Sequence, residues 1–245
     1  MARHSHWAQI KLKKGVTDKK RGKIFSKHSR LIEIATKNSG GDVNTNASLR
    51  LAIENARADN MPKENIDRAI KKGTGELKEG EQMQEVSYEG YGPGGIALVI
   101  DTLTDNKNRT NQAVSMILRE HGGHLGSAGA TGFLFESKGV LEIGSKSGGE
   151  NDELEIIDAG AEDIEKDDGV IFVYTKPNEF SSVKKKLEEK GFKIISAQLL
   201  KLAKVLVEIS DPKILEKIEA LLEALDEEDD VVNVAINIYF RQREI

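Results

Sequence analysis

The sequence predicts an α+β protein: a small N-terminal helical domain followed by two α/β (ferredoxin-like) domains, one inserted in the other. Three observations carry this prediction. Apolar residues recur at helical spacing up to about residue 75, and the spacing changes to that of strands beyond it. The order from Val140 to Leu199 is strand–helix–strand–strand–helix–strand, which is a complete ferredoxin-like unit. The segments on either side of it are each incomplete, and together they supply one sheet with two helices.

The first domain, residues 1–77, is predicted to hold three helices. A helix over Asp18–Lys37 has one apolar stripe at helical spacing, which includes Ile24, His28, Leu31 and Ala35. Because His28 lies in that stripe, we expect a partly buried core histidine there. A second helix buries Leu49 to Ala56, and a third begins at Asn60-Met61-Pro62 and ends at Gly73.

The rest of the chain alternates strands and helices. A discontinuous α/β domain is predicted over residues 78–137 and 202–245, with an inserted domain over residues 138–201. The predicted strands are Val86–Tyr88, Ile96–Leu103, Thr131–Phe135, Val140–Ile143, Gly169–Thr175, Phe192–Leu199, Val205–Ile209 and Val231–Tyr239, with one more near Gly160–Glu165. The predicted helices are Asn108–Glu120, Leu154–Ala159, Pro177–Glu189 and one from Asp211-Pro212 to Leu225.

Composition excludes several classes of protein. The chain has 245 residues and no cysteine, which rules out disulfide scaffolds, thiolate zinc sites and cysteine nucleophiles. The longest apolar runs, such as Ile96–Ile100, are too short to span a bilayer. No apolar segment follows the basic N-terminus, so a secretory signal is not expected. The expected protein is soluble and cytoplasmic, without membrane contact.

The net charge of −5 conceals a strong polarity along the chain. Residues 1–75 hold 17 Lys/Arg and 7 Asp/Glu, a net charge of +10, whereas residues 76–245 have a net charge of −15. The basic segment Arg3–Arg30 contains ten basic residues and a single acid, Asp18. Charges this dense repel one another unless a polyanion neutralises them, so the pattern predicts contact with phosphates. The residues expected to bind nucleic acid are Lys11, Lys13, Lys14, Lys19, Lys20, Arg21, Lys23, Lys27 and Arg30.

A second contact surface is a weaker hypothesis. The loop Gly90–Gly95 formally matches the dinucleotide-binding pattern G-x-G-x-x-G, but a strand follows it where that fold needs a helix. We therefore interpret it as a tight hairpin turn flanked by Tyr88 and Tyr91, two aromatic residues that could meet a ligand. Nearby, Thr104-Asp105-Asn106 offers helix caps, and Lys107 and Arg109 lie where that helix begins.

The sequence favours a protein without catalytic activity. It contains no phosphate-binding P-loop and no nucleophile elbow, and the acidic stretch Glu150–Asp168 lacks the spacing of a calcium loop, which favours a solvated surface. The histidine pairs His4/His6 and His121/His124 have no acidic partners at helical spacing, so no metal, cofactor or small-molecule substrate is expected.

Several motifs in the right order resemble the YebC/PmpR family along the full length of the chain. They include the opening Met1–Ala8 with the lysines that follow it, Asn60–Ile70, Tyr88–Gly95, Thr104–Thr110 and Asp229–Val234. The resemblance implies three domains and a role as a probable DNA-binding transcriptional regulator. It also implies an alternative, because the mitochondrial relative is a translational activator of cytochrome oxidase, and ribosome-associated roles in elongation have been proposed for the family.

Two targets therefore stay open for the basic segment. The family description favours duplex DNA. The residues themselves slightly favour ribosomal RNA or a ribosome-bound tRNA, because a basic arm needs no groove geometry and no helix-turn-helix signature is certain.

Overall fold

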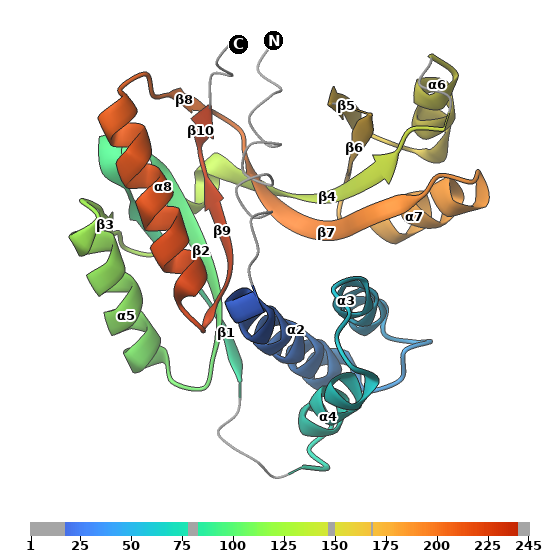
Figure 1. Ribbon diagram of the computed structural model, residues 1–245, viewed down its shortest axis with the longest axis horizontal. Helices are drawn as coiled ribbons and strands as arrows, with labels where there is room; N and C mark the ends of the chain where they lie inside the picture. The colour runs from blue at the N-terminus through green and yellow to red at the C-terminus, as the bar shows by residue number, and fades with distance from the viewer. Residues whose placement is uncertain (1–17, 78–82, 147–149, 168, 240–245) are drawn as a thin grey trace. The chain divides into compact units, whose positions relative to one another are not determined.

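The computed structural model describes residues 18–77, 83–146, 150–167 and 169–239, and the fold is α+β as the sequence predicts (Figure 1). The described chain divides into two compact units. One is Glu136–Leu202, and the other combines the chain before Glu136 with the chain after Leu202. Among the described helices, none combines the length and the apolar character needed to cross a membrane.

Over residues 18–77, the structure describes three helices: α2 (Asp18–Ser39), α3 (Ala47–Ala58) and α4 (Lys63–Gly73). Their shared core includes the buried side chains of Ile32, Leu49, Ile53 and Ile66. The carboxamide of Asn46 caps α3 by accepting a hydrogen bond from the Leu49 N–H at 3.0 Å. A β-carbon at Gly73 would lie 2.5 Å from the Glu33 carbonyl oxygen, so glycine is what lets α4 end against α2.

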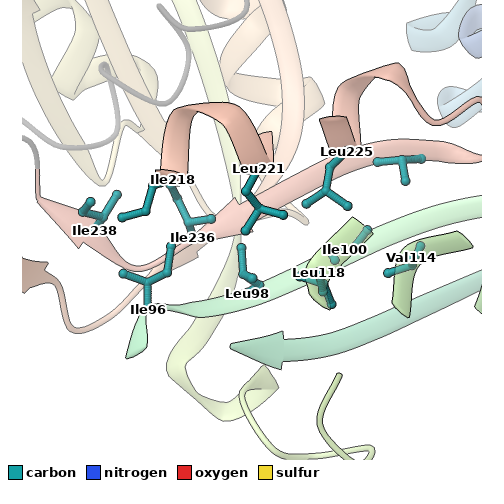
Figure 2. Close-up of a cluster of buried hydrophobic side chains, with 11 residues drawn as sticks. Ile96, Leu98, Ile100, Val114, Leu118, Ile218, Leu221, Leu225, Ile236 and Ile238 are labelled. Atoms are coloured by element: carbon teal, nitrogen blue, oxygen red, sulfur yellow. The ribbon is translucent and has the colours of Figure 1, made fainter. Parts of the chain in front are cut away.

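The same unit contains a four-stranded antiparallel sheet in the order β3-β1-β2-β9. Its strands are β1 (Gln84–Tyr91), β2 (Ala97–Thr104), β3 (His124–Leu125) and β9 (Val231–Ile236). Helices α5 (Lys107–Glu120) and α8 (Pro212–Glu227) cover one face, where Leu98 and Ile100 of β2 meet Leu118, Leu221 and Leu225 (Figure 2). The other face buries Ala97 and Val99 against Phe135 and Ala203.

The glycine-rich turn is a short 3-10 helix, η1 (Pro93–Gly95), which connects β1 directly to β2. Gly94 and Gly95 have φ values of 73° and 76°, a region that side chains rarely adopt, so the turn requires glycine. A strand follows the turn, as expected, and no helix is placed there to receive a pyrophosphate.

The strand expected over Val231–Tyr239 is interrupted at Asn237. Its side-chain oxygen accepts a hydrogen bond from the Ala97 N–H at 2.7 Å, and its carbonyl accepts one from the Val207 N–H at 2.7 Å. The chain therefore leaves the main sheet and continues as β10 (Ile238–Tyr239), which pairs in parallel with β8 (Val207–Glu208).

The unit Glu136–Leu202 has the predicted strand and helix order. Its elements are β4 (Phe135–Gly144), α6 (Glu150–Ala159), β5 (Asp163–Asp167), β6 (Val170–Thr175), α7 (Phe180–Glu189) and β7 (Ile194–Ala203). The sheet order β5-β6-β4-β7, with antiparallel β4–β6 and β5–β6 pairs, is that of a ferredoxin-like unit. One predicted strand is wrong: Thr131–Phe135 contains a 3-10 turn, η2 (Gly132–Leu134), and β4 begins only at Phe135.

Candidate nucleic-acid interface

The basic side of α2 lies against the acidic turn Asp226–Asp230, which joins α8 to β9. The Lys23 ammonium donates a hydrogen bond to the Glu227 carbonyl at 2.5 Å. The Lys27 ammonium donates to the Asp226 carbonyl at 3.1 Å and forms an ion pair with the Asp226 carboxylate at 2.7 Å. The acidic turn therefore contacts both Lys23 and Lys27, two of the residues predicted to bind phosphate.

Asp230 ends the acidic turn and is the centre of a buried polar network. Its side chain is only 2% exposed and accepts hydrogen bonds from the hydroxyls of Thr110 at 2.6 Å and Thr104 at 3.1 Å. The Arg109 guanidinium lies 2.9 Å from one carboxylate oxygen, and the Arg30 guanidinium lies 3.2 Å from the other. The network ties α2 to the ends of β2 and β9 and to the first turn of α5.

The network sets the charge state of Asp230. Burial on its own raises the pKa of the Asp230 carboxyl, but hydrogen bonds from Thr110, Arg109 and Thr104 and the charge of Arg30 together outweigh burial and lower the pKa below its ordinary value. The carboxylate is therefore ionised at neutral pH and can pair with both guanidinium groups.

The predicted phosphate-binding residues fall into two groups. Lys11, Lys13 and Lys14 lie outside the described residues, and Lys19, Lys20 and Arg21 belong to the first turn of α2, where the side chains are not described. The other three, Lys23, Lys27 and Arg30, are held by the chain's own acidic turn. In this conformation Lys27 and Arg30 are paired with carboxylates of the same chain and Lys23 donates to a backbone carbonyl, which the sequence alone did not indicate.

The residues suggested for a second contact make local structural bonds. The Tyr88 hydroxyl donates to the Lys107 carbonyl at 3.1 Å. Burial, and then the negative charge of Asp230, raises the pKa of Tyr88, which keeps its hydroxyl a donor. The Asn106 side chain caps α5 by accepting from the Arg109 N–H at 3.1 Å. The guanidinium of Arg109 also pairs with Asp105 at 2.8 Å, while the Lys107 side chain is exposed.

Tyr91 belongs to a different cluster from Tyr88. Its hydroxyl donates to the Ala130 carbonyl at 3.1 Å, and its ring stacks on His124 with 5.3 Å between the ring centroids. His124 therefore serves as the stacking partner of Tyr91. The Nδ1 atom of His121 lies 2.9 Å from the Ile117 carbonyl oxygen. Within the described part of the chain, no group of three or more metal-ligating side chains is gathered.

His28 is buried in the helical core, as its place in the apolar stripe predicts. Its Nε2 lies 2.6 Å from the Asp59 carboxylate, at the end of α3, so this histidine joins α2 to α3. His4 and His6 lie outside the described residues.

Glu89 is a structural residue that the sequence analysis missed. Its carboxylate accepts hydrogen bonds from the backbone N–H groups of Gly129 at 2.9 Å, Thr131 at 2.6 Å and Gly132 at 2.6 Å. Desolvation on its own raises the pKa of Glu89. The hydrogen bonds from these three N–H groups and from the Thr131 hydroxyl outweigh desolvation and lower the pKa below its ordinary value, so the carboxylate is ionised. The only sequence signal was an acidic residue between Tyr88 and the hairpin turn.

Comparison with known proteins extends over the whole chain. Residues 5–76 match the TACO1/YebC protein N-terminal domain, and residues 83–238 match the TACO1/YebC second and third domain. A probable transcriptional regulatory protein from Aquifex aeolicus is 48% identical over 238 residues, covering 97% of this chain and 95% of the relative. One from Dictyoglomus turgidum is 46% identical over 239 residues, covering 97% and 95%.

A solved structure supports the same relationship. The crystal structure of a conserved hypothetical protein from Aquifex aeolicus superposes with a TM-score of 0.88 at 45% sequence identity, covering 98% of this chain and 99% of the other. Sequence motifs, domain order and three-dimensional fold therefore agree, and the chain belongs to the TACO1/YebC family.

Proposed function

We propose that this protein is a non-enzymatic, nucleic-acid-binding regulator of gene expression. The observation that carries the proposal is the basic segment Arg3–Arg30, with ten basic residues and one acid, in a chain whose net charge is −5. Phosphates neutralise such a segment, and the release of condensed counterions drives binding. The names of the relatives, probable transcriptional regulatory proteins, support a regulatory role.

The proposed target is duplex DNA, the template on which a transcriptional regulator acts, and the proposed location is the cytoplasm. The second candidate is a ribosome-associated translation factor that binds ribosomal RNA or tRNA. It is favoured by two observations. Four of the ten basic residues, Arg3, Lys11, Lys13 and Lys14, precede α2, and a basic arm needs no groove geometry. The described cations of α2 contact the chain's own acidic turn.

Binding assays with the full chain test the function and separate the targets. Labelled duplex DNA and a structured RNA are titrated at several salt concentrations, and the chain is sedimented with ribosomes. We expect the logarithm of the affinity to fall steeply and linearly with the logarithm of salt concentration. Ribosome sedimentation with weak duplex binding would assign the chain to translation. Weak binding to all three targets at low salt would contradict the proposal.

The acidic turn limits this surface in the described conformation. A phosphate backbone that reaches Lys23 or Lys27 competes with the Glu227 carbonyl or the Asp226 carboxylate, because those groups already accept one or two of the three donors of each ammonium. The turn thus acts as an intramolecular competitor for nucleic acid. The surface pair costs little to break, since exposed ion pairs contribute about 0.2–1 kcal/mol.

Replacing Asp226 with asparagine is expected to raise the affinity for nucleic acid about two- to fivefold at low salt, because Lys27 loses its competing carboxylate. Fluorescence anisotropy with a labelled duplex measures the change. The matched control is Asp229→Asn, which removes the same charge from an exposed position in the same turn. Equal gains from both variants would show that only net charge matters and that the turn does not compete.

A further inference from the structure

Phe133 is unusual among the aromatic residues. Of the phenylalanine and tyrosine residues whose side chains the structure describes, it alone is exposed, with 66% of its surface accessible. Burying a phenylalanine normally contributes about 1.5–3 kcal/mol. The fold leaves this contribution unused at Phe133, so the ring is available to a ligand.

The backbone that presents this ring is firmly held. The Glu89 carboxylate accepts the N–H groups of Thr131 and Gly132, immediately before Phe133. The buried Thr131 hydroxyl donates to the Leu98 carbonyl at 2.8 Å, and the Leu134 N–H donates to the Thr131 carbonyl at 2.9 Å. A ligand that meets Phe133 therefore meets an ordered loop, and little conformational entropy is lost on binding.

A cation lies at the backbone of Phe133. The Lys204 N–H donates to the Leu134 carbonyl at 2.8 Å, and the Lys204 ammonium donates to the Phe133 carbonyl at 2.8 Å. The ammonium has three donors, so others remain for an anion. Val205 follows Lys204 in the chain and is another exposed apolar residue, with 61% of its surface accessible.

We infer that Phe133 and Lys204 form a contact for one unpaired base of a single-stranded segment of nucleic acid, with the base stacked on the ring and an adjoining phosphate bound by the ammonium. This inference rests on the proposed function. An aromatic face with a neighbouring cation is the pairing that binds single strands without reading their sequence. One phenyl ring and one valine are far smaller than the surface of about 800 Å² that each partner contributes to a stable protein interface, whereas a single base needs no more.

The test uses the full chain with a single-stranded oligouridylate and, in parallel, a blunt duplex of equal length. Phe133→Ala is expected to weaken binding of the single strand roughly 5- to 100-fold. The salt dependence should not change, because no phosphate contact is removed, and duplex binding should be unaffected. Phe133→Tyr should retain affinity, and Phe133→Leu should not restore it. The control is Met116→Ala, which removes an exposed apolar side chain from α5.

Several results would overturn the inference. Unchanged single-strand affinity in Phe133→Ala would show that the ring does not stack, and the proposed function would survive if the basic segment were still required. Full recovery in Phe133→Leu would indicate an apolar protein contact instead. A loss of self-association in Phe133→Ala, measured by analytical ultracentrifugation, would assign the ring to a second copy of the chain. Failure of the unmodified chain to bind any nucleic acid would reject the proposed function itself.

Discussion

Asp230→Ala is expected to lower the free energy of unfolding by about 3–5 kcal/mol, the range found when one member of a buried charge network is removed. The substitution removes the acceptor that the buried hydroxyls of Thr104 and Thr110 share, and leaves Thr110 with only the Asn106 carbonyl and the Thr104 hydroxyl. It also leaves the guanidinium groups of Arg30 and Arg109 facing each other without the carboxylate between them. Urea unfolding followed by circular dichroism measures the loss.

Asp229→Ala is the matched control, because Asp229 is the exposed neighbour in the same acidic turn. A surface substitution of this kind usually changes stability by no more than about 0.5 kcal/mol. A similar loss in both variants would mean that the charge of the turn, and not the network around Asp230, stabilises the fold. A small loss in Asp230→Ala would mean that Arg30 and Arg109 find equivalent partners elsewhere.

The same residue gives a pH dependence with a definite sign. The pKa of Asp230 is lower in the folded chain than its ordinary value of 3.8. Its stabilising contribution is therefore complete above the unfolded pKa and is lost as the pH falls through the lower folded pKa. The stability difference between the unmodified chain and Asp230→Asn should be constant near neutral pH and should shrink in acid below about pH 4. A difference that grew on acidification would contradict the assignment.

Local patterns in the sequence were sufficient for much of the fold. Helical spacing, the capping residues Thr104-Asp105-Asn106 and the order of elements from Val140 to Leu199 predicted the α+β class, because each depends on residues that are near one another in the chain. The strand predicted over Thr131–Phe135 failed for a non-local reason. Glu89, some 40 residues earlier, takes the N–H groups that a strand would have offered to a neighbour.

The candidate site was harder to predict than the fold. The charge pattern singled out the cations of α2 but said nothing about what they meet, since Lys27 and Asp226 are separated by 199 residues. A face of one charge is typical of a polyanion contact when it is open. It is also what a helix needs to dock on an acidic turn of its own chain. Only the tertiary structure distinguishes the two for Lys23, Lys27 and Arg30.

Lys23, Lys27 and Arg30 already contact the acidic turn of the same chain. We therefore expect the largest loss of nucleic-acid binding when the lysines before α2 are replaced. Replacing Lys11, Lys13 and Lys14 with alanine should lower the affinity for duplex DNA on the order of 100- to 1,000-fold near 0.1 M salt, because three phosphate contacts and their counterion release are lost. The slope of log affinity against log salt should become shallower by roughly 2–3 for the same reason. Titrations by fluorescence anisotropy at several salt concentrations measure both quantities.

A second triple variant tests whether nucleic-acid binding depends on a particular cationic surface or only on the net charge of the chain. Lys185, Lys186 and Lys190 are exposed lysines at the end of α7 and just after it, and replacing them with alanine removes the same charge from the inserted unit. We expect little change in affinity and an unchanged salt slope. Equal losses in the two triples would mean that nucleic acid responds only to total charge. Because the chain carries a net charge of −5, binding to a polyanion requires a segregated cationic surface, and the N-terminal triple is the direct measure of it.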